Sequence, residues 1–216
     1  MKGYKLSNKP DPFQYISDTH AWQDYFALEL LGKNKRWLEI GANHPFKNGN
    51  NTALLELYGW SGISIEIDGK YKDAWKNSWR DDSVLKIADA ITYDYSSLKD
   101  KHFNFIQLDC EPPNVTYTIL EKVLNAGLTF DSMTFEHDLY SNPLVYMKIK
   151  NDAYDIISDY GYRRIYEDVP RSDMLRQVYS YEDWYVSQDI KYEINDWSTW
   201  AKSIKGKYAK GERRIV

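Results

Sequence analysis

RWLEIGANHPFKNGNNTALLELYGWSGISIEID, residues 36–68, decides the fold of this chain. An apolar run stops at Gly41, a polar loop follows, and a helical apolar pattern ends at Gly59. Alternating isoleucines then predict a second strand, with Glu66 and Asp68 at its carboxyl end. The stretch therefore predicts a strand, a glycine turn, a helix and a strand, which together form the β-α-β unit that binds nucleotides.

The turn itself indicates which nucleotide fits. Gly41 permits close backbone approach, the helix start offers free N–H groups, and Glu66, 25 residues after Gly41, can accept two ribose hydroxyl hydrogen bonds. A pyrophosphate needs several glycines, whereas this turn reads GANHPFKNGNN. S-adenosylmethionine carries no phosphate, so it fits such a turn better than a dinucleotide does. Strand-end acids and glycine turns also occur in α/β proteins that bind no nucleotide, and the spacing alone leaves this alternative open.

Length and composition bound the class of protein. The chain has 216 residues, which suits one domain, and its 43% hydrophobic content is typical of a globular core. A net charge of −4 gives no general attraction to nucleic acid or to an anionic membrane. Cys110 is the only cysteine, which excludes an internal disulfide and a multi-cysteine zinc site. The sequence has neither an apolar signal region nor a run of about 18 apolar residues, so the expected location is cytoplasmic, away from the membrane.

Helices and strands alternate along most of the chain. Further strands are predicted at 84–89, 103–109, 130–138, 162–168 and 181–188. Helices are predicted at 17–31, 69–79, 114–126 and 146–160. This pattern matches the class I methyltransferase architecture, an α/β fold with a seven-stranded, mostly parallel Rossmann-like sheet, helices on both faces and an antiparallel pair of strands at its end. Its strand order, 3-2-1-4-5-7-6, is inferred from that architecture and not from the strand spacing.

The segments that flank this unit are assigned separate roles. Residues 1–34 are expected to form a lead-in and an entry helix, 35–190 the methyltransferase-type domain, and 191–216 a basic extension. The extension is predicted to begin with a short helix around 197–204, and it ends in a run of Lys and Arg residues. A solvated tail is the favoured interpretation of this run, and an arm that contacts nucleic acid phosphates is the alternative.

Seven short motifs along the chain form a series. The opening motifs are QDYFALELLG at 23–32, WLEIGAN at 37–43, NNTALLE at 50–56 and GWSGISIEID at 59–68. The later motifs are FIQLDCEP at 105–112, MTFEHD at 133–138 and EDWYV at 182–186. This series resembles the FkbM-type methyltransferase family, and its order is more specific than any one motif. The resemblance implies a class I fold, S-adenosylmethionine as the methyl donor and O-methylation of a hydroxyl group.

The resemblance also implies a donor site at the strand ends. The residues that it assigns to the cofactor are Glu39, Gly41, Asn43, Glu66, Asp68 and Asp89. Glu39, Gly41 and Asn43 would surround the methionine part, while Glu66 would bind the ribose with Asp68 beside it. Asp89, which closes the third predicted strand, is the candidate for the adenine amine.

Two departures from the family pattern bear on activity. After the EIGAN turn the chain has HPF at 44–46 in place of an Asp-Gly type continuation. After Asp-x-Glu it has PPN at 112–114 instead of Gly and an acid. Proline is rigid and lacks an N–H group, so the reshaped loop can alter substrate choice or weaken activity. EPPN is also similar to the Asn/Asp-Pro-Pro-aromatic motif of enzymes that methylate amino groups on DNA, but it lacks the first and last residues of that motif.

The candidate catalytic residues follow the fourth and fifth predicted strands. They are Asp109, Glu111, Glu136 and His137, of which the first two match the family's Asp-x-Glu motif. Methyl transfer is an in-line displacement at a sulfonium, so the protein must align the acceptor and remove the proton of a hydroxyl. Each residue has a structural alternative: Asp109 can cap a helix or orient the donor, Glu111 can order its loop, and His137 can hydrogen-bond Glu136. A divalent metal is not predicted, because no tight ligand spacing supports one, although carboxylates with one histidine suit such an ion. Cys110 is expected on the opposite strand face from Asp109, in the core.

The favoured function is S-adenosylmethionine-dependent O-methylation of a hydroxyl on a small molecule or a glycan. One alternative is a binding module that keeps the fold without turnover, which the EPPN segment motivates. A nicotinamide-dependent oxidoreductase is disfavoured by the single-glycine turn. Nucleic-acid methylation is disfavoured by the net charge, and the basic carboxyl-terminal run is the feature in its favour.

Overall fold

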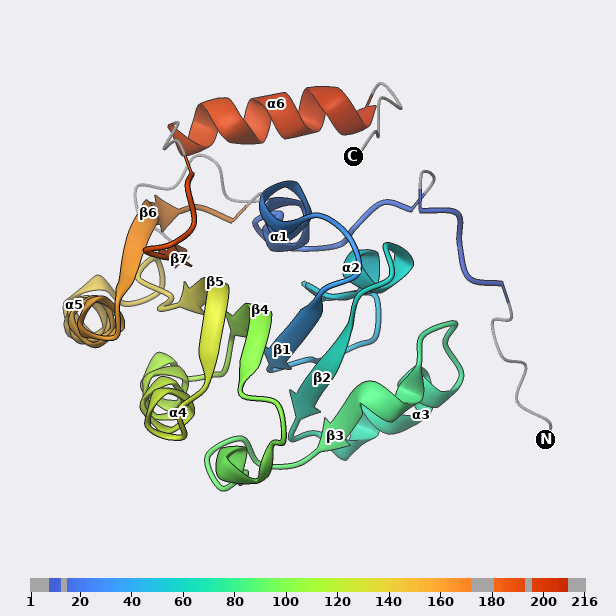
Figure 1. The fold of residues 1–216 in the computed structure, drawn as a ribbon, viewed down its shortest axis with the longest axis horizontal. Coiled ribbons are helices and arrows are strands. Elements are labelled where there is room, and N and C mark those ends of the chain that lie inside the picture. Colours follow the sequence, from blue (N-terminus) through green and yellow to red (C-terminus); the bar gives the residue numbers. More distant parts are fainter. Residues whose placement is uncertain (1–7, 13–14, 172–180, 193–195, 210–216) are drawn as a thin grey trace.

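One mixed sheet organises the molecule (Figure 1). The computed structural model describes residues 8–12, 15–171, 181–192 and 196–209. The strands are β1 (Arg36–Ile40), β2 (Ser61–Glu66), β3 (Leu85–Ile87), β4 (His102–Leu108), β5 (Thr129–Glu136), β6 (Tyr162–Val169) and β7 (Glu182–Ser187). Their order is β3-β2-β1-β4-β5-β7-β6, which confirms the predicted seven-stranded class I methyltransferase sheet.

Strand direction follows the predicted pattern. Strands β1 to β5 pair in parallel with their neighbours. Strand β7 runs antiparallel to both β5 and β6, so the predicted antiparallel pair is present at one end of the sheet. The carboxyl ends of β1 to β5 therefore meet at one edge, which is where open α/β sheets bind ligands.

Helices cover both faces of the sheet. They are α1 (Gln23–Leu31), α2 (Ala53–Leu57), α3 (Lys72–Lys76), α4 (Pro113–Asn125), α5 (Pro143–Asp159) and α6 (Trp197–Ala209), with 3₁₀ turns η1 (Gly69–Tyr71), η2 (Asp82–Val84) and η3 (Tyr95–Ser97). Figure 1 shows α4 and α5 on one side of the sheet and α1, α2 and α6 on the other. None of the helices in the described part of the chain has the length and apolar character that a membrane crossing requires.

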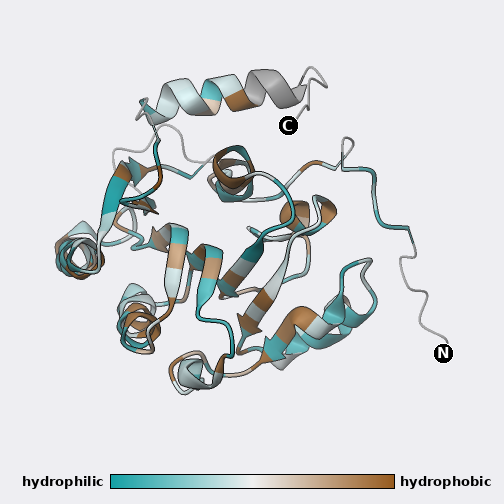
Figure 2. Ribbon diagram, viewed as in Figure 1, coloured by the Kyte–Doolittle hydropathy of each residue, from teal (hydrophilic) through white to brown (hydrophobic). Residues whose placement is uncertain are grey.

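The sheet separates two apolar cores, because successive strand residues point to opposite faces. Trp37 and Phe105 join the core beneath α1, α2 and α6. Their neighbours Leu38 and Ile106 join the core beneath α4 and α5. All of α2 is buried, and its ribbon is coloured largely as apolar in Figure 2.

Helix starts differ in part from the predictions. The entry helix begins at Gln23 and not near Ser17, because Trp22 takes a left-handed backbone conformation (φ 67°) just before it. The sequence offers Asn50 or Asn51 as a cap for α2. Thr52 occupies the N-cap position, and Asn50 Oδ1 accepts hydrogen bonds from the backbone N–H groups of Thr52 and Ala53. The helix predicted at 69–79 is shorter and divides into η1 and α3.

The two flanking segments pack into the same core as the sheet. Phe26 of α1 lies 4.6 Å from Trp184 of β7, measured between ring centroids, and Trp200 of α6 lies 5.4 Å from Trp184. Trp200, Ala201 and Ile204 are buried, so the short helix predicted around 197–204 is confirmed as the start of α6 and packs into the core. The remainder of the basic run, residues 210–216, lies outside the described residues.

Asp24 in the first turn of α1 makes stability depend on pH. Burial raises the pKa of Asp24 to about 7 from its ordinary value of 3.8, although Ser17 and Thr19 donate hydrogen bonds to it. The folded state therefore keeps a proton that the unfolded state releases between these two values. Stability falls as pH rises through this window, by up to about 1.4 kcal/mol per pH unit from this group.

We expect Asp24→Asn to remove this contribution. The difference in unfolding free energy between Asp24→Asn and the wild type should increase from about pH 4 to about pH 7 and then level off. Urea unfolding at several pH values measures this difference. Parallel pH profiles for the two proteins would show that Asp24 titrates normally in the fold.

Candidate functional site

A cavity of about 520 Å³ lies at the carboxyl edge of the parallel strands. Eight of the ten residues predicted for the site line it, namely Gly41, Asn43, Glu66, Asp68, Asp89, Asp109, Glu111 and Glu136. Glu39 and His137 are buried and do not line this cavity. Most of the predicted residues therefore meet at this cavity, whereas the predicted positions of Glu39 and His137 in the site are wrong.

The Gly41 turn connects β1 to both neighbouring strands. The N–H groups of Gly41 and Ala42 donate to the carbonyl oxygen of Ile65, each at 3.0 Å, and Asp109 N–H donates to the carbonyl oxygen of Ile40. Gly41 has φ 89°, and a Cβ there would lie 1.7 Å from the carbonyl oxygen of Asp109. Only glycine fits this position, which explains the glycine in the turn.

Glu66 is fixed in place by the backbone around it. Its Oε2 accepts from the Asn43 N–H and its Oε1 from the Asp68 N–H, both at 2.7 Å. A carboxylate oxygen has two lone pairs, so each oxygen can still accept a second hydrogen bond. The carboxylate is therefore pre-oriented to accept from two vicinal hydroxyls, as a ribose presents them.

Asp68 has a more local role. Its carboxylate accepts from the Lys70 N–H at 2.9 Å and forms an ion pair with the Lys70 ammonium. These hydrogen bonds hold the pKa of Asp68 below its usual range. Asp68 lines the cavity wall, but its carboxylate caps η1.

An apolar slot lies beside Glu66. Ile67, Ile91, Val115 and Ile119 line the same cavity, and Ile67 is 68% exposed. Asp89 lines the same cavity, and its Oδ1 accepts from the Ile91 N–H at 2.8 Å. An apolar slot next to a carboxylate suits a purine ring with an exocyclic amine. Ile67 follows the end of β2, so the alternation that buries Ile65 does not bury Ile67, and its exposure was not predicted.

Glu39 lies beneath the turn and supports it. Its carboxylate accepts from Thr52 Oγ1 at 2.8 Å, Ser64 Oγ at 2.7 Å and the Asn51 N–H at 3.2 Å. Burial raises the pKa of Glu39, and the positive charge of Arg80 opposes that rise. Glu39 shares a strand face with Trp37, so the alternation of β1 directs it under α2 and not toward a ligand.

Arg80 is the centre of the same polar network and was missed by sequence reasoning. It donates to Glu56 Oε2 at 2.8 Å, to the Pro45 carbonyl at 2.8 Å and to Thr52 Oγ1 at 2.9 Å. Its guanidinium lies 4.4 Å from the centroid of the Trp75 ring. The side chain is fully buried, so Arg80 ties the loop after Gly41 to the helices behind it.

The opposite end of the cavity is acidic. Asp109 and Glu111 follow β4, Glu136 closes β5, and Asp138 follows two residues later. Burial and the neighbouring Asp109 and Asp138 raise the pKa of Glu136 well above its usual range. Burial together with Asp138 and Asp109 also raises the pKa of Glu111. Asp138 was not predicted, although it directly follows the Glu-His pair in the sequence.

Three more residues at this end were missed. Tyr181 donates from its hydroxyl to Asp109 Oδ2 at 3.2 Å, and His20 Nδ1 lies 3.4 Å from the same hydroxyl. Arg171 also lines the cavity, with its guanidinium 5.7 Å from the centroid of the Tyr181 ring. Cys110, expected in the core, lines the cavity as well, and burial raises the pKa of its thiol.

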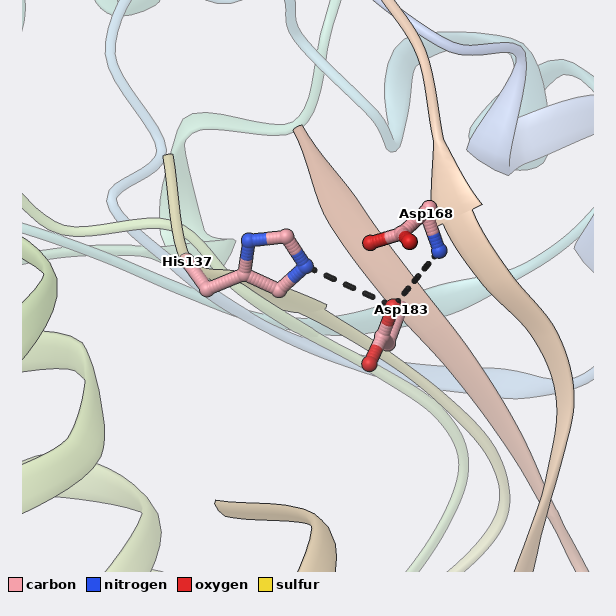
Figure 3. A group of neighbouring side chains, drawn as sticks. All are labelled: His137, Asp168 and Asp183. Atoms are coloured by element: carbon pink, nitrogen blue, oxygen red, sulfur yellow. Dashed lines mark hydrogen bonds and ion pairs between the residues drawn. The ribbon is translucent and has the colours of Figure 1, made fainter. Parts of the chain in front are cut away.

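His137 belongs to a separate buried network. Figure 3 shows its ring directed at Asp183, with Nε2 3.4 Å from Oδ1, while the Asp168 N–H donates to the same oxygen at 2.8 Å. The proposed hydrogen bond to Glu136 is therefore wrong, because successive strand residues face opposite ways. Two cationic side chains complete the network: Arg164 bonds Asp183 Oδ2 at 2.9 Å, and Lys150 pairs with Asp168.

No protein-family model matches the chain. A search of curated proteins gave no match either.

Solved structures share the fold at low sequence identity. WbdD, in a co-crystal with the kinase inhibitor LY294002, has a TM-score of 0.50 and 14% identity over 76% of this chain and 39% of that chain. This chain thus spans less than two thirds of WbdD. A putative rRNA methylase from Clostridium thermocellum has a TM-score of 0.47 and 12% identity, over 76% of this chain and 92% of that one.

A SAM-dependent O-methyltransferase from Thermotoga maritima has a TM-score of 0.42 and 12% identity, over 79% of this chain and 66% of that one. Known structures with methyltransferase titles are thus among those found. At 14% identity the likeness to WbdD shows a common fold alone.

Proposed function

We propose that this protein is an S-adenosylmethionine-dependent methyltransferase of the FkbM type. The observation that carries the proposal is Glu66, whose two oxygens are each set by a backbone N–H at the end of β2. The slot with Asp89 suits adenine, and the Gly41 turn suits an amino-acid part better than a pyrophosphate. The donor would therefore lie along the edges of β1, β2 and β3 with its methyl group toward the acidic end. The single free cysteine agrees with a cytoplasmic location.

The acidic end is suited to activate an acceptor hydroxyl. In the proposed reaction the hydroxyl oxygen forms a bond to the methyl carbon while the carbon–sulfur bond breaks, and its electron pair stays on sulfur. The acceptor proton passes to Asp109, which already accepts from the Tyr181 hydroxyl, with His20 next to that hydroxyl. Glu111 and Glu136 would position the acceptor.

A small molecule or a glycan is the proposed acceptor class. Carboxylates dominate the acidic end, with Arg171 as the cation among the described residues that line it. Such a site repels a phosphate backbone, so it favours a neutral hydroxylated compound over nucleic acid. Incubation with methyl-labelled S-adenosylmethionine and a panel of sugars and small alcohols tests this proposal. Label transfer to one of them is expected, whereas donor binding without transfer to any acceptor class would favour the binding module.

Glu66→Gln should weaken donor binding. The amide places an N–H group against one of the two backbone N–H donors, and it removes the negative charge that the ribose hydroxyls would meet. We expect a loss of about 1–3 kcal/mol in the binding of S-adenosylhomocysteine, measured by calorimetry. Asp100→Asn is the matched control, because Asp100 is 69% exposed, lies before β4 and pairs only at the surface with Arg36. If Glu66→Gln and Asp100→Asn bind S-adenosylhomocysteine with equal affinity, Glu66 does not contact the donor.

A further inference from the structure

Three carboxylates converge where the acidic end of the cavity meets the sheet. Glu111 follows β4, Glu136 ends β5, and Asp138 follows β5 with a left-handed backbone (φ 49°). One oxygen of each lies within 4.8 Å of the others. Residues two apart in an extended chain point to the same side, so Asp138 lies on the side of Glu136.

Two of these carboxylates each have a buried oxygen without a hydrogen-bond partner. Glu136 is 5% exposed and Asp138 is 3% exposed, and the oxygens concerned are Glu136 Oε2 and Asp138 Oδ1. Buried carboxylate oxygens are normally paired or bound to a metal, because their desolvation is otherwise uncompensated. The two atoms therefore indicate a cationic ligand that both can contact.

We propose that Glu111, Glu136 and Asp138 bind one divalent cation, Ca²⁺, Mg²⁺ or Mn²⁺. Carboxylate oxygens suit these ions. Two oxygens on opposite sides of one ion lie at twice the metal–oxygen distance, which is about 4.6–5.2 Å for Ca²⁺ and about 4.2 Å for Mg²⁺. The three oxygens lie within 4.8 Å of one another, so one ion can contact all of them, and the exposed Glu111 leaves room for adjustment to the smaller ions.

The described part of the chain contains a second group of possible metal ligands, which differs from Glu111, Glu136 and Asp138 in its neighbouring charges. His137, Asp168 and Asp183 also lie within 4.8 Å of one another. There, however, Lys150 and Arg164 already supply the positive charge. Near Glu111 the corresponding cation is Arg171, whose guanidinium packs over Tyr140 and Tyr181 at 6.0 and 5.7 Å from the ring centroids.

The use of the cation rests on the proposed function. A divalent ion at this end of the cavity can bind the acceptor hydroxyl and lower its pKa, so that the oxygen attacks the methyl carbon as an alkoxide. The released proton passes to Asp109 or to water. The cation itself is neither oxidised nor reduced, and it also holds the acceptor in line with the sulfonium.

Manganese binding tests the site without any methyl donor. The full-length protein is treated with a chelator, exchanged into buffer and titrated with Mn²⁺, and free Mn²⁺ is followed by electron paramagnetic resonance. We expect one saturable site that Ca²⁺ or Mg²⁺ competes for, and a loss of about tenfold or more in affinity for Glu136→Gln and for Asp138→Asn. Asp100→Asn should bind as the wild type does. No saturable binding, or unchanged binding in both site variants, would overturn the proposal.

Donor binding separates this inference from the proposed function. S-adenosylhomocysteine titrations of the wild type and of Glu136→Gln, with and without Mn²⁺, should show binding in every case. Loss of Mn²⁺ binding in a variant that still binds S-adenosylhomocysteine also shows that this variant is folded. If the protein binds Mn²⁺ at these residues but does not bind S-adenosylhomocysteine, the metal site is supported and the methyltransferase proposal is refuted.

Discussion

Gly41→Ala should destabilise the protein by about 3 kcal/mol or more and abolish donor binding. The added Cβ would lie 1.7 Å from the Asp109 carbonyl oxygen, at a backbone φ of 89° that disfavours any side chain. Relief requires β1 and β4 to separate, which breaks the hydrogen bond from the Asp109 N–H to Ile40. The turn, Asp109 and the strand edge under the donor would all move. Urea unfolding and calorimetry with S-adenosylhomocysteine measure the two effects.

Gly127→Ala is the matched control for this prediction. Gly127 also has a positive φ, 74°, but a Cβ there meets no atom within 4 Å. It should cost about 1 kcal/mol from backbone strain alone and leave donor binding intact. If the two variants lose the same stability, the contact between β1 and β4 is not what requires glycine at Gly41.

Arg80→Met should destabilise the fold by about 3–5 kcal/mol, the cost of breaking a buried ion pair from one side. Glu56 would lose its partner at 2.8 Å, and its side chain is only 10% exposed. The Pro45 carbonyl and Thr52 hydroxyl would lose donors at the same time. Because these groups belong to the loop after Gly41, donor affinity should fall together with stability.

The double variant Arg80→Met with Glu56→Gln tests the physical reason. Removing both charges removes the uncompensated carboxylate, so the pair should be less destabilised than the sum of the single variants by about 1 kcal/mol or more. Additive losses in urea unfolding would show that Arg80 acts through packing on Trp75 and not through its charge.

Much of the fold could be predicted because it depends on local pattern. The alternation of Ile63 and Ile65 in β2, the stop at Gly41 and the hydrogen bonds to Asn50 before α2 are short-range signals that the structure confirms, whereas Ile67 lies beyond β2 and is exposed. The strand order was predicted only from the class I methyltransferase architecture, because the sequence of a parallel strand does not indicate which strands lie beside it. The helix start at Gln23 could not be read, because it depends on the left-handed backbone of Trp22.

The site was predictable only where strand ends place side chains directly. Glu66, Asp89 and Asp109 reached the cavity for that reason. Strand alternation also predicts the direction of His137, because neighbouring strand residues such as Glu136 and His137 point to opposite faces.

Contacts between distant residues were not predictable. Arg80 lies in a polar stretch that is typical of a solvated surface, and its bonds to Glu56 and Pro45 exist only after folding. Cys110 packs against the core that holds Ile106 and Leu108, as alternation predicts, but its place in the cavity wall was not predictable.

The central claim is that the cavity above β1 and β2 binds an adenosyl sulfonium and not a phosphorylated coenzyme. Calorimetric titration of the full chain with S-adenosylhomocysteine, and separately with NADH, tests it most directly. We expect saturable one-site binding of S-adenosylhomocysteine, weakened by Glu66→Gln and unchanged by Asp100→Asn, with no binding of NADH. Binding of NADH and indifference to S-adenosylhomocysteine would contradict it.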